Sequence, residues 1–304
     1  MTTPQQLLAN AAAELLDPQG RALAGAVEWW ALPGLPEQWP VAAIGTGPPV
    51  LLLHGFDSSM LEFRRLVPLL ASDHQLILPD LYGFGFTPRP ADGAYNPAGV
   101  LSHLESLITA LLARWSADNP PQAASPTLGV IGASMGGSVA MELARRLPER
   151  ISRLLLLAPA GLTGRPMPVP PLLDSLGVRF LSLPWVRRGL CRSAFADPAN
   201  GMGAAELEIA SLHLQAPGWA MALGQFARSG GFAGCGHPLP LQPIDVLWGT
   251  QDRILRPAQK SAALALLGDR VVELDHCGHL PHIDQPQLVA AQWRQFSPRS
   301  APKT

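Results

Sequence analysis

One stretch decides how the whole chain is interpreted: LGVIGASMGG, residues 128–137. Its first four residues form a short run that is mostly apolar, which is typical of a buried strand. Residues 139–144 place apolar side chains at helical spacing, and this pattern ends in two arginines and a nearby proline. We therefore expect Ser134 to lie on a tight turn between a buried strand and a helix.

Gly132 and Gly136 flank Ser134 in the pattern Gly-x-Ser-x-Gly, which in this context predicts a nucleophile elbow. The glycines remove side chains that would collide where the strand folds back into the helix, and the serine is left on a strained backbone with its hydroxyl exposed. The pattern alone is common enough to arise by chance, and Ser134 could instead be an ordinary helix N-cap. The rest of the chain decides between the two interpretations.

Composition limits the class of protein. The chain has 304 residues, of which 47% are hydrophobic and 15% charged, which suits one large α/β core with an insertion. The formal net charge of −1 lacks the basic footprint of a nucleic-acid-binding protein. We therefore expect no nucleic acid as a partner, while the sequence does not indicate an oligomeric state.

Cysteine usage and the N-terminus indicate the compartment. Cys191, Cys235 and Cys277 form an odd set without the spacing of a disulfide framework, which fits a reducing environment. Residues 1–10 lack the features of a signal peptide, and no run reaches the roughly 18 apolar residues of a membrane helix. A cytoplasmic location is expected.

Strands and helices are expected to alternate along most of the chain, after a helical lead over residues 1–25. Short apolar runs predict strands at 27–32, 41–44, 50–53, 75–78, 128–131, 154–157, 244–248 and 271–274. Helical patterns follow at 60–70, with Pro68 as a break, and at 100–115, 139–146, 258–267 and 287–296. Residues 119–125 are expected to be a linker and 297–304 a frayed end. This alternation predicts an α/β fold with a doubly wound, mostly parallel sheet.

The alternation stops over residues 162–241, which begin with a proline-rich segment and contain helical patches at 180–190, 204–214 and 219–226. We interpret this segment as a helical cap inserted into a core formed by residues 1–161 and 242–304. Ligands of doubly wound sheets bind at the carboxyl ends of the strands, so the cap is expected to lie there.

Three residues in the order Ser, Asp, His could form a catalytic triad. A serine hydroxyl needs a base to take its proton, and the base needs an acid to hold its tautomer. Asp252 and His279 each follow a predicted strand, at the edge of the sheet where Ser134 should emerge. Asp252 could instead only cap the turn before Ile254, but no other carboxylate follows the strand at 154–157.

Backbone amides are expected to bind the oxyanion. One belongs to Met135, which follows the serine at a helix N-terminus, where the helix dipole favours negative charge. The other belongs to Phe56, in the loop after the strand at 50–53.

Other polar residues compete for these roles. His276 and His282 are alternatives to His279, and their spacing tempts a metal interpretation, but Gly278 and Pro281 prevent the helix that would align them. We expect no metal and no cofactor. His54 is expected mainly to orient its loop, and Asp80 to accept amide hydrogen bonds in its glycine-rich loop.

Taken together, the motifs resemble the α/β-hydrolase fold superfamily in order and spacing. They are His54-Gly55-Phe56, the loop 80–87, Gly132–Gly137, Trp248-Gly249 with Asp252, and Gly278-His279-Leu280-Pro281. The resemblance covers about residues 40–160 and 240–297. Asp57-Ser58-Ser59 is similar to a branch of photosynthetic bacteria and plastids that includes chlorophyll dephytylase-like relatives. Because the elbow carries a serine, the chain departs from the branches with an aspartate nucleophile.

The resemblance implies a serine hydrolase whose triad is Ser134, His279 and Asp252. The expected reaction is cleavage of an ester, or a related thioester or lactone, of a small to medium apolar substrate through an acyl-enzyme. Carbon–carbon cleavage, lyase or acyl-transfer chemistry on the same machinery, and a non-catalytic ligand-binding homologue, remain open.

Substrate contacts are expected from five residues: His54, Phe56, Met135, Trp185 and His282. The cap segment 179–192 combines apolar residues with arginines, which favours a lid over the pocket and leaves peripheral membrane contact as the alternative.

Overall fold

The computed structural model describes residues 2–118 and 126–295. The expected linker at 119–125 and the expected frayed end at 297–304 lie outside these residues. Among the helices of the described chain, none is long and apolar enough to cross a membrane.

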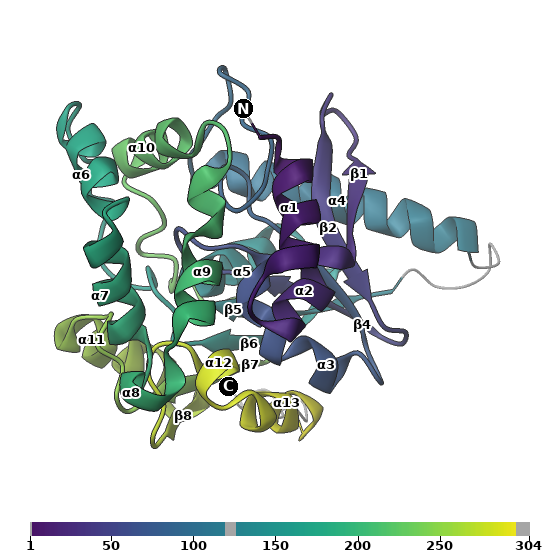
Figure 1. The fold of residues 1–304 in the computed structure, drawn as a ribbon. Helices are drawn as coiled ribbons and strands as arrows, with labels where there is room; N and C mark the ends of the chain where they lie inside the picture. Colours follow the sequence, from purple (N-terminus) through teal and green to yellow (C-terminus); the bar gives the residue numbers. More distant parts are fainter. Residues whose placement is uncertain (1, 119–125, 296–304) are drawn as a thin grey trace.

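An eight-stranded sheet forms the centre of the molecule (Figure 1). β2 is antiparallel to both of its neighbours, and all other neighbouring pairs are parallel. In spatial order the strands are β1 (Val27–Ala31), β2 (Gln38–Ile44), β4 (Gln75–Pro79), β3 (Pro49–Leu53), β5 (Leu128–Ala133), β6 (Ile151–Leu157), β7 (Ile244–Gly249) and β8 (Val271–Leu274). The predicted α/β class and mostly parallel sheet are confirmed.

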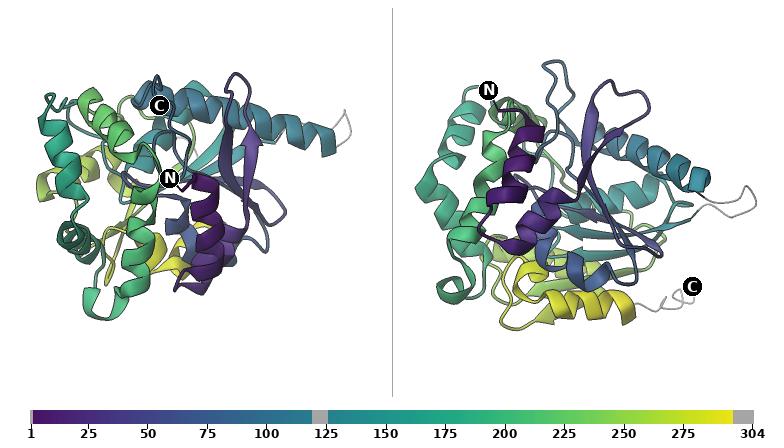
Figure 2. Two further views of the ribbon diagram at one scale, coloured as in Figure 1. Left: turned by 45° about the horizontal axis from the view of Figure 1, so that its top comes forward. Right: turned by 45° about the vertical axis from the view of Figure 1, so that its right-hand side comes forward.

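Helices cover both faces of this sheet (Figures 1 and 2). Outside the cap segment they are α1 (Pro4–Glu14), α2 (Pro18–Gly25), α3 (Val67–Leu70), α4 (Pro97–Asp118), α5 (Met135–Arg146), α11 (Pro257–Leu267), α12 (Pro281–Asp284) and α13 (Pro286–Gln295), with the 3₁₀ turns η1 (Met60–Arg65) and η3 (Gly268–Arg270).

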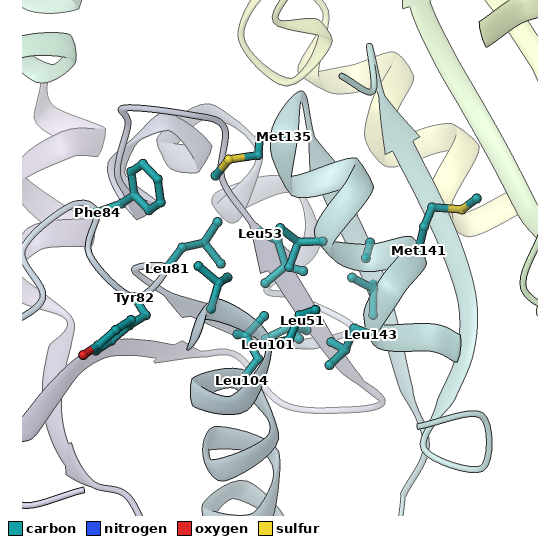
Figure 3. Close-up of a cluster of buried hydrophobic side chains, with 14 of the residues drawn as sticks. Leu51, Leu53, Leu81, Tyr82, Phe84, Leu101, Leu104, Met135, Met141 and Leu143 are labelled. Atoms are coloured by element: carbon teal, nitrogen blue, oxygen red, sulfur yellow. The ribbon is translucent and has the colours of Figure 1, made fainter. Parts of the chain in front are cut away.

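Successive side chains of β3 enter two different hydrophobic cores. Leu51 and Leu53 pack into the core that contains residues of α4 and α5, whereas Val50 and Leu52 pack into the core that contains residues of α1, α3 and α13. This division follows from the alternation of side chains along a strand that is buried on both faces. Figure 3 shows the first core, where Leu51 and Leu53 lie close to side chains of α4 and α5. The elbow therefore stands on a rigid support.

Two local predictions are corrected by the structure. The single helix expected over residues 60–70 is the 3₁₀ turn η1 followed by α3, and Pro68 lies in the first turn of α3. Proline is tolerated there because the first turn leaves its amides without helical partners, so Pro68 lies at the start of a helix where a break near a helix end was expected. The continuous patch expected at 180–190 is divided between two helices of the cap segment for the same reason, since Pro184 begins the second of them.

The segment between β6 and β7, residues 162–241, which we call the cap, contains helices only. They are α6 (Leu173–Leu181), α7 (Pro184–Ala194), α8 (Pro198–Gly201), α9 (Ala204–Leu212), the 3₁₀ turn η2 (His213–Gln215) and α10 (Trp219–Ser229). Figure 1 shows α6 and α7 along the outer edge of the molecule, on the side away from β1.

Candidate functional site

Ser134 lies between the end of β5 and the start of α5, with φ at 51° and ψ at −118°. Such a φ is strained for a residue with a side chain. The flanking glycines make the turn possible: a Cβ on Gly132 would lie 2.4 Å from the carbonyl oxygen of Gly136, and a Cβ on Gly136 would lie 2.1 Å from that of Leu53. The local backbone is therefore that of a nucleophile elbow.

The three residues expected to form a triad meet at this turn. The Nε2 atom of His279 lies 2.9 Å from Oγ of Ser134, and its Nδ1 atom lies 2.9 Å from Oδ2 of Asp252. Asp252 follows β7 and His279 follows β8, so neighbouring parallel strands deliver the two side chains to the same edge of the sheet. The geometry suits a base that takes the serine proton while a carboxylate stabilises the resulting imidazolium.

Asp252 is held by more than the imidazole. The indole Nε1 of Trp248 donates to Oδ2 at 3.0 Å, and the amides of Ile254 and Leu255 donate to Oδ1 at 2.9 and 3.2 Å. Burial would raise the pKa of Asp252, but its interaction with His279 and the amide hydrogen bonds from Ile254 and Leu255 lower it below its usual range. The carboxylate is therefore ionised at neutral pH. Trp248 belongs to the motif Trp248-Gly249, but the motif alone does not predict this contact.

The loop that carries Phe56 lies against the elbow. A Cβ on Gly55 would lie 3.3 Å from Cβ of Ser134, and α5 begins with Met135 beside the end of β3. The amides of Phe56 and Met135 thus belong to the two segments that flank the hydroxyl of Ser134. Their role as oxyanion donors stays a prediction.

Glu62, a buried residue of η1, fixes this loop from the side of the core. Its Oε1 accepts a hydrogen bond from the amide of Gly55 at 3.1 Å, and its Oε2 accepts one from the hydroxyl of Ser58. Burial raises the pKa of Glu62 to about 7, although both hydrogen bonds act in the opposite direction. Glu62 was not among the residues predicted from the sequence, where its only signal is a carboxylate one helical turn after Ser58.

Asp57 fixes the same loop from the side of the cap. Arg187 of α7 donates to its Oδ2 at 2.6 Å, Nε2 of His213 lies 3.1 Å from its Oδ1, and Nε1 of Trp219 donates to Oδ1 at 2.8 Å. Burial lowers the pKa of His213, so its imidazole is neutral at pH 7 and the compensating charge is that of Arg187. Three elements of the cap therefore converge on the residue that follows Phe56.

Two cavities meet at Phe56. The first has a volume of about 350 Å³ and is lined by Ser134 and His279 together with mainly apolar residues of the cap, among them Leu181, Leu190, Cys191, Ala194 and Ile209. The second has a volume of about 300 Å³ and is lined by Phe56, Met135 and apolar residues that include Met167, Val169 and Phe226. Apolar walls around a polar catalytic edge favour apolar ligands.

Phe56 and Met135 line cavities as expected for substrate contacts, but His54, His282 and Trp185 do not. His54 is fully buried: its Nδ1 donates to the carbonyl oxygen of Gly55 at 2.8 Å, and its Nε2 accepts from the amide of Leu81 at 2.9 Å. The predicted loop-orienting position of His54 is therefore what the structure shows, and its expected contact with substrate is corrected.

The expected substrate contacts of His282 and Trp185 are also corrected, for different reasons. His282 is fully buried and packs on the ring of Phe63, with ring centroids 4.9 Å apart. Trp185 lies on the outer side of α7 with 65% of its surface exposed. The sequence could not show whether Trp185 would face the cavity, because that depends on how α7 packs against other helices of the cap.

Asp80 takes the position expected of it. Its two carboxylate oxygens accept hydrogen bonds from the amides of Met60 and Phe86, each at 2.7 Å. Within the described residues, no group of three or more His, Cys, Asp or Glu side chains is placed to hold a metal ion.

Comparison with known proteins gives consistent matches. The family model described as "Alpha/beta hydrolase family" matches residues 50–292. The chain is 29% identical to the alpha/beta hydrolase domain-containing protein VTE7 of Arabidopsis thaliana, over 85% of this chain and 76% of that protein. It is also 29% identical to the 2-hydroxymuconate semialdehyde hydrolase of Pseudomonas sp. (strain CF600), over 81% of this chain and 86% of that one. The plant relative agrees with the resemblance to chlorophyll dephytylase-like proteins.

Solved structures show the same fold at lower identity. A thermophilic esterase from Thermogutta terrifontis has a TM-score of 0.67 at 22% identity, covering 88% of this chain and 97% of that one. A meta-cleavage product hydrolase from Pseudomonas fluorescens IP01 has a TM-score of 0.66 at 22% identity, covering 85% of this chain and 94% of that one.

Proposed function

Because the chain belongs to the alpha/beta hydrolase family, as the match over residues 50–292 shows, we propose that it is a serine hydrolase that cleaves carboxylic esters of small to medium apolar compounds. The observation that carries this proposal is the unbroken hydrogen-bonded series from Ser134 through His279 to Asp252, which opens into an apolar cavity. No cofactor enters the proposed reaction.

The reaction follows from the geometry. Oγ of Ser134 attacks the ester carbonyl while Nε2 of His279 takes the hydroxyl proton, and the amides of Phe56 and Met135 hold the developing oxyanion. His279 then gives its proton to the leaving alkoxide, which departs as an alcohol. Water attacks the acyl-enzyme with His279 again as the base, and the acid and the free hydroxyl of Ser134 are released.

Labelling with a fluorophosphonate probe tests the nucleophile. We expect wild-type protein to be labelled on the peptide that contains Ser134, and we expect Ser134→Ala to remove both the label and the hydrolysis of short p-nitrophenyl esters. Undiminished labelling of Ser134→Ala would overturn the proposal, as would a labelled wild-type protein that turns over no ester, thioester or lactone. The second result would leave acyl transfer, lyase chemistry or a non-catalytic ligand-binding role.

Carbon–carbon bond cleavage is the second candidate, because the relative from strain CF600 is named a 2-hydroxymuconate semialdehyde hydrolase. That substrate carries a carboxylate, whereas the two arginines that line the first cavity are both paired. Arg187 contacts Asp57 at 2.6 Å, and Arg64 contacts Asp17 at 2.6 Å and Glu206 at 3.5 Å. Among the described residues, the lining therefore offers an anionic substrate no unpaired cation, which favours an uncharged ester.

Separate kinetic measurements with the two substrates distinguish the two reactions. The purified protein is given 2-hydroxymuconate semialdehyde or p-nitrophenyl butyrate in parallel, and the rates are compared. We expect faster turnover of the ester, and a higher kcat/KM for the semialdehyde would transfer the assignment to carbon–carbon cleavage.

A cytoplasmic location is part of the same proposal. All three cysteines are buried and free, which suits a reducing compartment. Fractionation of cells that produce the protein at its natural level would test this, with recovery from an oxidising compartment as the contradicting outcome.

A further inference from the structure

The outer face of α6 is apolar. Leu173, Leu176 and Phe180 follow one another at helical spacing and are 56%, 62% and 50% exposed, and the adjacent Leu172 is 79% exposed. Asp174 and Val178, on the opposite face, are buried against the rest of the cap. The helix therefore has the reverse of the usual arrangement, since its apolar stripe faces outward. Exposed apolar patches of this kind mark interaction sites.

The outer face of α7 continues this patch and adds positive charge. The rings of Phe180 and Trp185 are in contact, with centroids 5.3 Å apart, so the patch crosses from one helix to the other. Trp185 shares its side of α7 with Arg188 and Arg192, which are also exposed. Figures 1 and 2 show both helices at the periphery of the molecule. We call the exposed side chains Leu172, Leu173, Leu176, Phe180, Trp185, Arg179, Arg188 and Arg192 the outer cap face.

The exposed arginines of this face are not ion-paired. Over residues 172–194 the sequence has four arginines and one acid, Asp174, which is buried and ion-paired with Arg228 at 3.1 Å. Arg187 is buried against Asp57. In the described part of the chain, no carboxylate lies within ion-pairing distance of Arg179, Arg188 or Arg192.

We propose that the outer cap face binds the surface of an anionic lipid bilayer. Apolar side chains beside a tryptophan and arginines are the combination that inserts at the boundary between headgroups and acyl chains, where the guanidinium groups reach the lipid phosphates. Each arginine near an anionic membrane strengthens binding roughly fivefold.

The positive charge of the outer cap face also argues against a second copy of this chain as its binding partner. A two-fold contact through this face would bring the unpaired arginines of the two copies toward one another, and no acidic side chain of the face could offset their repulsion. An anionic lipid surface supplies the missing negative charge.

Binding would bring the first cavity close to the lipid. The inner sides of the same two helices line that cavity through Leu181, Leu190 and Cys191. A bilayer under the outer cap face would therefore be separated from the cavity only by α6 and α7. Apolar compounds dissolved in the bilayer would reach the proposed hydrolase from its cap side.

Sedimentation with sucrose-loaded vesicles tests the proposal. Vesicles of phosphatidylcholine with phosphatidylglycerol are compared with vesicles of phosphatidylcholine alone, using the full-length protein. We expect binding to the mixed vesicles that weakens at high salt. Leu176→Ser/Phe180→Ser and Arg188→Glu/Arg192→Glu should each reduce it by roughly tenfold or more. Leu288→Ser/Arg150→Glu, which changes an exposed leucine and an exposed arginine outside the cap, should bind as wild type does.

Fluorescence locates the contact. Brominated lipids should quench wild-type protein more than Trp185→Phe, because Trp185 would enter the interface. Melting temperature and the hydrolysis of a water-soluble ester confirm that each variant is folded, and vesicle binding is measured whether or not the ester is turned over.

Three results would overturn the proposal. They are the absence of binding to mixed vesicles, equal binding to both vesicle types, and variants of the outer cap face that bind as wild type does. A wild-type dimer that Leu176→Ser/Phe180→Ser converts to a monomer, with no binding to vesicles, would assign the face to self-association.

Discussion

The guanidinium of Arg187, on α7, contacts the carboxylate of Asp57 at 2.6 Å, and both side chains are buried. Asp57 follows Phe56 directly, so the ion pair links the cap to the loop that would supply an oxyanion donor. Removing one member of a buried pair leaves the other charge without compensation, which costs about 3–5 kcal/mol.

We predict that Asp57→Asn lowers the free energy of unfolding by about 3 kcal/mol and lowers kcat about tenfold or more, with a smaller effect on KM. Urea unfolding and ester kinetics measure the two effects. Arg187→Met should destabilise to a similar degree, and the double variant should lose at least about 1 kcal/mol less than the sum of the single losses. Additive losses would show that the pair does not act as a unit.

Trp248 supplies a second prediction, because its indole donates to the carboxylate of Asp252 at 3.0 Å. Trp248→Phe should lower kcat by about tenfold or more at nearly constant KM, since a hydrogen bond to a charged group contributes about 1.5–3 kcal/mol. Trp39→Phe is the matched control: that side chain is equally buried, and its Nε1 has no hydrogen-bond partner among the described residues. Equal losses of kcat in both variants would assign the effect to packing alone.

Glu62 leads to a prediction about pH. Burial raises its pKa from 4.5 to about 7, so the folded protein favours the protonated form. Protonated Glu62 therefore stabilises the folded state. This contribution to the free energy of unfolding is complete below the unfolded pKa and is lost as the pH rises through 7, and its full size is about 3 kcal/mol.

Glu62→Gln keeps an acceptor for the amide of Gly55 and cannot ionise. The free energy of unfolding of both proteins is measured in urea at several pH values between 5 and 8. The value for Glu62→Gln should rise relative to that of wild type as the pH rises, because only wild type loses the contribution of protonated Glu62. Asp80 has a pKa raised in the same direction and its charge contributes to the raised pKa of Glu62. Because Asp80 is present in both proteins, its own titration cancels in the difference, apart from this coupling to Glu62. A difference that does not change with pH would contradict the prediction.

The triad could be predicted because short motifs determine it. Ser134, Asp252 and His279 each follow a strand of the sheet, and parallel strands that run side by side end at the same edge. Their hydrogen bonds then follow from the fold.

The environment of Asp57, Glu62 and Trp185 could not be predicted in the same way. Asp57 takes its partners from residues at least 130 positions away, in a segment without recognisable motifs. Glu62 lies in a segment for which a single helix was expected. The 3₁₀ form of that segment, which depends on packing, decides where its side chain points. The exposure of Trp185 depends on which side of α7 packs against the rest of the cap, and those packing partners lie in other segments of the chain.

The first cavity leads to a prediction about substrate length. Cys191, on α7, is buried and lines this cavity together with Ser134 and His279. Cys191→Phe adds a bulky ring to a space of about 350 Å³ while leaving the triad and the loop of Phe56 unchanged. A long acyl chain that occupies this cavity would then lose its place, whereas an acetyl group would not reach the ring.

We expect kcat/KM for p-nitrophenyl octanoate to fall by about tenfold or more relative to the acetate, because several methylene groups at about 0.8 kcal/mol each lose their burial. Hydrolysis of the acetate serves as the internal control for folding. The matched variant is Ala227→Phe, which narrows the second cavity, on the other side of Phe56. If Ala227→Phe selectively impairs the octanoate and Cys191→Phe does not, the acyl chain occupies the second cavity and the leaving group the first.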